Sequence, residues 1–227
     1  MYIALSEQLK LVGHQLCPYV QRVVILTSEK KIDILRFDIE LHAKPKWFHK
    51  LSPTGKVPIL ITENMTTIFD SNVICDYLDE VTAGSLYPED IIERAKCRSW
   101  IQYGNDILND IAMLIYIDQD IIKYKSRIKS IREKLEVLES IHSGGRYLLG
   151  ENFYLVDAVY ATIFRYFVIL ELPLEGFKFL RDFRKLDSWK NYLFQRESIL
   201  NAVPRDYNNL LVAFIKRQKS YLSCTLL

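Results

Sequence analysis

Hydrophobic and polar positions follow two different rhythms along the first third of the chain. Short apolar or alternating runs predict strands, and apolar side chains at helical spacing predict the segments between them. The predicted strands cover 9–13, 35–41, 57–61 and 65–69, and the predicted helices follow Pro18, Pro45 and Asp70. The resulting order, β-α-β-α-β-β-α, is that of a small α/β domain ending near Val81.

Beyond Thr82 only the helical period remains. Long helices are predicted around 101–115 and 121–138, the second stopped by Ser143-Gly144-Gly145, and further helices are expected after Pro173 and Leu186. The stretch 157–170 is apolar on nearly every face, which predicts a central buried helix. We therefore expect an α/β domain over 1–82, a linker over 83–91 and an all-helical domain over 92–227.

Composition excludes several classes of protein. The 227 residues are 49 % hydrophobic and 26 % charged with a net charge of +2, an ordinary globular balance. No apolar run reaches the roughly 20 residues that span a bilayer. Residues 178–227 hold 10 basic and 4 acidic side chains, which is typical of a solvated helical face, so we expect no nucleic-acid partner.

Four cysteines are present, at positions 17, 75, 97 and 224. They form no C-x-x-C pair and have no zinc-ligand spacing with the histidines, so we expect no metal and a reducing, cytoplasmic location. Cys75 and Cys97 fall inside helical patterns and are predicted to be core residues.

Cys17 is the candidate for chemistry, because it precedes Pro18 at a strand-to-helix junction. Proline is favoured at the first helical position, which places the cysteine at the helix N-terminus. Free N–H groups there favour an anion, so we expect the pKa of this thiol to be lowered. Cys-Pro-Tyr at such a junction resembles glutaredoxin, but Val20 replaces the second cysteine of that motif. A mixed disulfide at Cys17 would therefore need an external thiol to resolve it.

Three further positions each have two interpretations. Val57-Pro58 is either an ordinary strand edge or a cis bond that turns the Val57 backbone toward an extended peptide. Asp70-Ser71 is either a plain helix N-cap, with Ser71 as the capping residue, or a carboxylate-binding site. Lys44 is either solvated or the partner of a second carboxylate.

Together these residues resemble the cytosolic glutathione transferase superfamily over essentially the whole chain. Cysteine at the active position is similar to the omega, lambda and dehydroascorbate-reductase classes. The order of motifs looks omega-like: Lys44-Pro45-Lys46-Trp47-Phe48, then Pro53-x-Gly55-x-Val57-Pro58, then Asp70-Ser71, then Cys75-Asp76-Tyr77-Leu78-Asp79-Glu80. The resemblance implies a thioredoxin-like N-terminal domain, an all-helical C-terminal domain and a homodimer.

The resemblance also implies roles for single residues toward glutathione, the co-substrate. Cys17 would form the mixed disulfide and is the implied catalytic residue. Pro18 and Tyr19 would line the thiol, and Lys44 would face the glycine carboxylate.

The remaining implied roles lie on the other side of the site. The Val57 backbone would pair with the cysteine moiety of glutathione, and Pro58 would be cis. Asp70 and Ser71 would hold the γ-glutamyl end.

The implied activity is glutathione-dependent thiol transfer or reduction, similar to dehydroascorbate reductase, on a small disulfide or electrophilic substrate. Conjugation is the weaker variant, because it requires a residue that activates the glutathione thiol rather than one that bonds to it. The alternative is a non-catalytic regulatory protein of the same fold, similar to the stringent-starvation protein that binds RNA polymerase. We expect membrane association only if Cys224, in the terminal Cys-Thr-Leu-Leu, is prenylated.

One departure from the family pattern affects stability. The buried helix of the C-terminal domain usually opens with Ser/Thr-x-x-Asp, whereas Tyr154-Leu155-Val156-Asp157 stands here. Loss of a hydroxyl cap costs about 1 kcal/mol.

Overall fold

The computed structural model describes residues 8–171 and 178–226. These residues divide into two compact units. The sheet unit contains the chain up to Leu86 together with Asn201–Val203, and the helical unit contains Tyr87–Leu200 and Pro204 onward.

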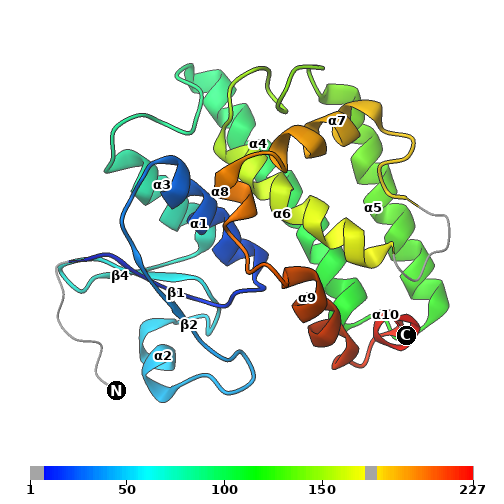
Figure 1. The fold of residues 1–227 in the computed structure, drawn as a ribbon, viewed down its shortest axis with the longest axis horizontal. Coiled ribbons are helices and arrows are strands. Elements are labelled where there is room, and N and C mark those ends of the chain that lie inside the picture. Colours follow the sequence, from blue (N-terminus) through cyan, green and yellow to red (C-terminus); the bar gives the residue numbers. More distant parts are fainter. Residues whose placement is uncertain (1–7, 172–177, 227) are drawn as a thin grey trace. The chain divides into compact units, whose positions relative to one another are not determined.

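The sheet unit is built on four strands in the order β2-β1-β3-β4. These strands and their helices are the blue to cyan part of the chain in Figure 1. The strands are β1 (Lys10–Gly13), β2 (Leu35–Asp38), β3 (Ile59–Ile61) and β4 (Thr67–Phe69), and the helices are α1 (Pro18–Glu29), α2 (Lys46–Leu51) and α3 (Ser71–Glu80). β1 and β2 are parallel, whereas β1–β3 and β3–β4 are antiparallel. The predicted element order is confirmed, and the unit is thioredoxin-like.

Close packing of α1 against the sheet depends on a glycine at the end of β1. A Cβ on Gly13 would lie 2.7 Å from Cγ1 of Val20 on α1, closer than two carbon atoms can pack. Val12 and Ile59 of the sheet and Phe48 of α2 are completely buried and belong to one apolar cluster. The α1 helix also packs against α3, so Cys17 is attached to a helix held on two sides.

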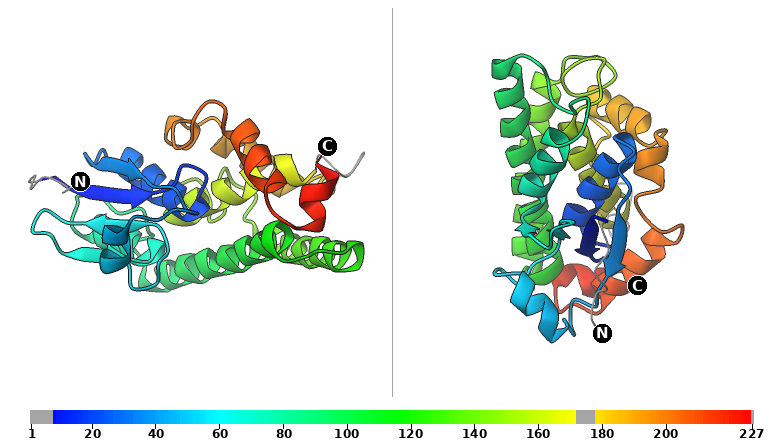
Figure 2. Two further views of the ribbon diagram at one scale, coloured as in Figure 1. Left: turned by 90° about the horizontal axis from the view of Figure 1, so that it is seen from below. Right: turned by 90° about the vertical axis from the view of Figure 1, so that its left-hand side faces the viewer.

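The helical unit contains two long helices that lie side by side, α4 (Ile91–Tyr116) and α5 (Ile121–Ile141) (Figure 2). It continues through α6 (Leu155–Leu170), α7 (Arg184–Leu193), α8 (Glu197–Leu200), α9 (Tyr207–Lys216) and α10 (Tyr221–Thr225). Every residue of α6 except Val168 is buried, which confirms the prediction of a central buried helix. A Cβ on Gly104 of α4 would lie 3.0 Å from Val159 of α6, so glycine again permits a close approach.

Two sequence predictions need correction or restriction. The N-cap of α3 is Asp70 rather than Ser71, because the Asp70 carboxylate accepts the free N–H groups of the first turn while Ser71 is already helical. The helix expected after Pro173 falls partly on 172–177, which lie outside the described residues, and 178–183 form turns before α7 begins at Arg184. In the described part of the chain, no helix has both the length and the apolar character needed to cross a bilayer.

Candidate functional site

Cys17 is the residue immediately before α1, and Pro18 is the first residue of that helix, as predicted. The carbonyl of Cys17 accepts the N–H groups of Val20 and Gln21, both at 3.1 Å. The Cys17 N–H donates to the carbonyl of His14 at 3.0 Å. The backbone is therefore held on both sides of the thiol, and the side chain remains partly exposed.

The net shift in the pKa of the Cys17 thiol is opposite to the expectation. Burial raises the pKa, and this effect outweighs the N–H groups of Val20 and Tyr19 and the positive charges of Arg22 and Arg36, which lower it. The helix N-terminus acts in the predicted direction, but loss of water around the sulfur is the larger effect.

A cis peptide bond joins Val57 to Pro58, as the family resemblance implied. The Cys17 thiol donates a long hydrogen bond to the Val57 carbonyl, with sulfur and oxygen 4.0 Å apart. The structure thus brings the backbone of Val57 beside the thiol, although 40 positions separate the two residues.

Two charged residues of the predicted site lie just before helices, Lys44 before α2 and Asp70 before α3. The Lys44 ammonium donates to the carbonyl of Gly55 at 2.8 Å, so a neutral oxygen holds the charge in place. Asp70 has a positive φ of 72°. Its Oδ1 accepts the N–H groups of Asn72 at 2.8 Å and Val73 at 3.4 Å. Ser71, the first residue of α3, is buried.

Arg22 was missed by reasoning from the sequence. It is completely buried, and its Nη1 donates to Oδ1 of Asn72 at 2.7 Å. Its guanidinium carbon lies 4.9 Å from the centre of the Tyr19 ring. The available signal was a charged residue among the apolar positions of α1, between Val20 and Val23.

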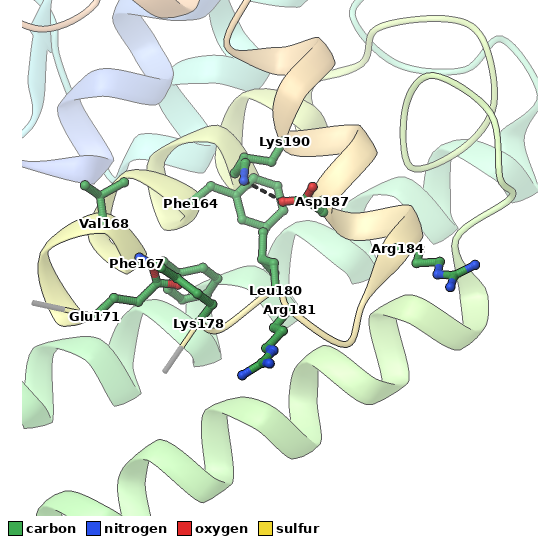
Figure 3. Close-up of a pocket in the computed structure, with 10 residues that line it drawn as sticks. All are labelled: Phe164, Phe167, Val168, Glu171, Lys178, Leu180, Arg181, Arg184, Asp187 and Lys190. Atoms are coloured by element: carbon green, nitrogen blue, oxygen red, sulfur yellow. Dashed lines mark hydrogen bonds and ion pairs between the residues drawn. The ribbon is translucent and has the colours of Figure 1, made fainter. Parts of the chain in front are cut away.

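A separate cavity of about 560 Å³ lies in the helical unit (Figure 3). Phe164, Phe167 and Leu180 form its apolar wall. Its two acidic groups are paired, Glu171 with Lys178 at 3.0 Å and Asp187 with Lys190 at 2.6 Å. The cavity is lined by none of the eight residues predicted for the glutathione site. Among the residues that the structure describes, no cluster of three or more His, Cys, Asp or Glu side chains suits a metal ion.

A thioredoxin-like unit followed by a helical unit is the fold of the glutathione transferases, and here Cys17 stands before α1 beside the cis-proline turn. Residues 16–81 match the family model of the glutathione S-transferase N-terminal domain, and residues 105–197 match that of the C-terminal domain. The chain belongs to the glutathione S-transferase family, and its relatives include the omega class.

Among similar proteins, the glutathione S-transferase DHAR2 of Arabidopsis thaliana is 31 % identical over 192 residues, which are 82 % of this chain and 83 % of that protein. The omega-1 enzyme of Sus scrofa is 38 % identical over 80 residues, 35 % of this chain and 33 % of its own. This match and the matches to two omega-2 enzymes span about a third of the length of those proteins. The structure of glutathione transferase Omega 3C from Trametes versicolor has a TM-score of 0.78 and 24 % identity, and covers 88 % of this chain and 91 % of that one.

Proposed function

We propose that this protein is a cysteine-type glutathione transferase that performs glutathione-dependent thiol transfer or reduction. The observation that carries the proposal is the placement of the Cys17 thiol before α1 and beside the Val57 carbonyl. Relatives named as omega transferases and as DHAR proteins support the same activity.

The proposed reaction proceeds through the thiolate form of Cys17. In the first step this thiolate attacks the glutathione sulfur of a mixed disulfide, R–S–S–G. The Cys17–S–S–G bond forms, and R–S⁻ leaves and takes up a proton. A glutathione thiolate then attacks the glutathione sulfur held on Cys17, which releases oxidised glutathione and restores the Cys17 thiolate. Because Val20 occupies the position of a second cysteine, the resolving thiol comes from outside the chain.

Glutathione is proposed to lie along the edge formed by the two helix starts and the cis-proline turn. Pro18 and Tyr19 would line its sulfur, and the backbone N–H and carbonyl of Val57 before Pro58 would pair with its cysteine moiety. A rice relative solved in complex with glutathione has a TM-score of 0.80 to this chain, which supports the fold on which this placement rests.

The two carboxylate ends of glutathione need cationic or N–H partners. Lys44 is proposed to face the glycine carboxylate, because a carbonyl rather than a carboxylate holds its ammonium. Asp70 and Ser71 are proposed to hold the γ-glutamyl end, where the Asp70 carboxylate supplies an acceptor for the α-amino group.

The same proposal includes a cytoplasmic homodimer. Ile91 and Ile92 at the start of α4 are 80 % and 67 % exposed, and Val73 on α3 is 52 % exposed. Ile91 and Ile92 are adjacent and both exposed, which is the kind of apolar surface that a homodimer would cover. Size-exclusion chromatography with light scattering measures the molar mass of the wild type and of Ile91→Ser/Ile92→Ser. A dimer mass for the wild type and a monomer mass for the variant would support the homodimer.

The decisive experiment compares two activities in the wild type and Cys17→Ser. Reduction of hydroxyethyl disulfide and of dehydroascorbate should fall at least about 100-fold in the variant, because serine forms no disulfide. Conjugation of glutathione to chlorodinitrobenzene should be low in the wild type. Full reductase activity in Cys17→Ser would overturn the mechanism, and failure of the wild type to bind immobilised glutathione would favour a non-catalytic regulator, which the relatives named above do not favour.

A further inference from the structure

Arg22 joins the two helices whose first residues form the proposed glutathione site. It lies on α1, five residues after Cys17, and its hydrogen bond at 2.7 Å ends on Asn72, the residue after Ser71 on α3. The cation thus spans the distance between the thiol end and the γ-glutamyl end of the site.

Complete burial makes this charge expensive to hold. An ionised group removed from water costs several kcal/mol unless its surroundings compensate it. The titratable groups that act on Arg22 include Cys17, just before α1, and Tyr19 of α1. They also include Asp70, just before α3, and Cys75 of α3. Burial lowers the pKa of Arg22 and all four groups raise it. One of them, Cys17, is the proposed nucleophile.

We propose that Arg22 is a positioning residue for the reaction at Cys17. Its hydrogen bond to Asn72 fixes the start of α3 relative to the start of α1, so that a bound glutathione meets both ends of its site in one geometry. Its buried charge favours the thiolate of Cys17 over the thiol. The first effect rests on the proposed glutathione site, whereas the second concerns the ligand-free thiol alone.

Cys75 does not compete with Cys17 for this role. Cys75 is completely buried, and burial raises its pKa to about 12, so it remains a thiol at any ordinary pH. Arg36 on β2 also lowers the pKa of Cys17, but its guanidinium is partly exposed and paired with Asp38 at 3.1 Å. Arg36→Gln is therefore the matched control for loss of a positive charge.

The test uses the full chain with Cys224→Ser as background, which leaves Cys17 as the one described cysteine outside the core. The rate of Cys17 alkylation by iodoacetamide is measured against pH in the background protein and in the added variants Arg22→Met, Arg22→Lys, Asn72→Ala and Arg36→Gln. We expect Arg22→Met to move the midpoint of the profile upward and to slow alkylation at pH 7.5 by about tenfold. Arg22→Lys should keep most of the rate, and Arg36→Gln should change it by less than about threefold.

Glutathione affinity separates the two effects. Asn72→Ala removes the hydrogen bond between α1 and α3 but keeps the positive charge of Arg22. We therefore expect an unchanged alkylation profile and about tenfold weaker binding of glutathione. An unchanged profile in folded Arg22→Met overturns the electrostatic role. If Arg22→Met does not fold, Arg22→Gln takes its place, and an unchanged profile in that variant overturns the electrostatic role as well. Unchanged glutathione binding in Asn72→Ala overturns the positioning role, whereas absence of glutathione binding in the background protein contradicts the proposed function and leaves the alkylation result standing.

Discussion

The indole N–H of Trp189 donates a 2.8 Å hydrogen bond to Oδ1 of Asp157, and both side chains are completely buried. The same Oδ1 accepts the N–H of Leu148 at 3.1 Å, and Oδ2 accepts the N–H of Tyr154 at 2.8 Å. One carboxylate thus connects the loop before α6, the first turn of α6 and the middle of α7. The Ser or Thr cap of the family pattern is replaced by Tyr154, whose side chain makes no capping hydrogen bond. The Asp157 carboxylate still accepts the N–H of the N-cap residue.

Removal of this carboxylate should destabilise the protein strongly. Asp157→Ala leaves two buried N–H donors and one part-buried N–H donor without an acceptor, so we expect the free energy of unfolding to fall by about 3–5 kcal/mol. Asp157→Asn retains an acceptor for Trp189 and Leu148 but turns a donor toward Tyr154, and we expect a loss of about 2 kcal/mol. Urea unfolding measures both. Asp187→Asn, on the partly exposed side of α7, is the control and should change stability by less than about 0.5 kcal/mol.

The pH dependence of stability offers a second test of the same residue. Burial raises the pKa of Asp157 to about 7, against the N–H groups of Tyr154, Leu148 and Trp189, which lower it. Between about pH 4 and pH 7 the folded chain therefore binds more protons at this site than the unfolded chain does. The contribution of Asp157 to stability is complete below pH 4 and is lost as the pH rises through 7. Unfolding at pH 5 and pH 8 should show a decrease for the wild type that is smaller in Asp157→Asn, and equal decreases would contradict the assignment.

Much of the fold follows from periodicity alone. The strand at β1, the hairpin of β3 and β4 and the buried α6 all have strong local patterns, and each appears within a few residues of its predicted place. The first residue of a helix was predicted less accurately where two neighbouring polar side chains could both act as the N-cap. Asp70 rather than Ser71 is the N-cap of α3, because its carboxylate accepts two N–H groups at once.

The site was predictable in its parts but not in its electrostatics. The positions of Cys17 and Pro18 followed from local helix rules, whereas the meeting of Cys17 with Val57 depends on the sheet that brings them together. The direction of the thiol pKa could not be predicted, because it depends on how much water the surrounding side chains exclude. Arg22 was not predicted as a site residue, because its hydrogen bond to Asn72 of α3 is a tertiary contact that no local sequence pattern indicates.

A buried ion pair in the sheet unit, between Lys30 and Asp79, should be a second place where a single substitution strongly lowers stability. Lys30 Nζ lies 2.8 Å from Asp79 Oδ1, and the two side chains are 4 % and 6 % exposed. Burial acts to raise the pKa of Asp79, but hydrogen bonds from Lys30, Ser85 and Leu86 hold it below its ordinary value.

We expect Asp79→Asn to lower the free energy of unfolding by about 3 kcal/mol, because it leaves the ammonium of Lys30 buried without a carboxylate. Glu80→Gln, an exposed neighbour on α3, provides the control. The contribution of Asp79 is present above the pKa of the unfolded chain and is lost as the pH falls through its lower folded value. Acid unfolding should therefore begin at a higher pH in Asp79→Asn, and an identical acid transition would exclude this role.

The contact between Gly13 and Val20 gives a prediction that a double variant can test. In Gly13→Ala the new methyl group would lie 2.7 Å and 2.9 Å from the two γ-carbons of Val20, so either α1 or the end of β1 must shift. We expect a loss of about 2 kcal/mol in stability, together with slower alkylation of Cys17 if the shift reaches the start of α1. Val20→Ala removes the two γ-carbons, so the double variant should lose about 1–2 kcal/mol less than the sum of the two single variants. Urea unfolding of all four proteins measures this coupling, and strictly additive losses would show that the two residues do not limit the approach of α1 to the sheet.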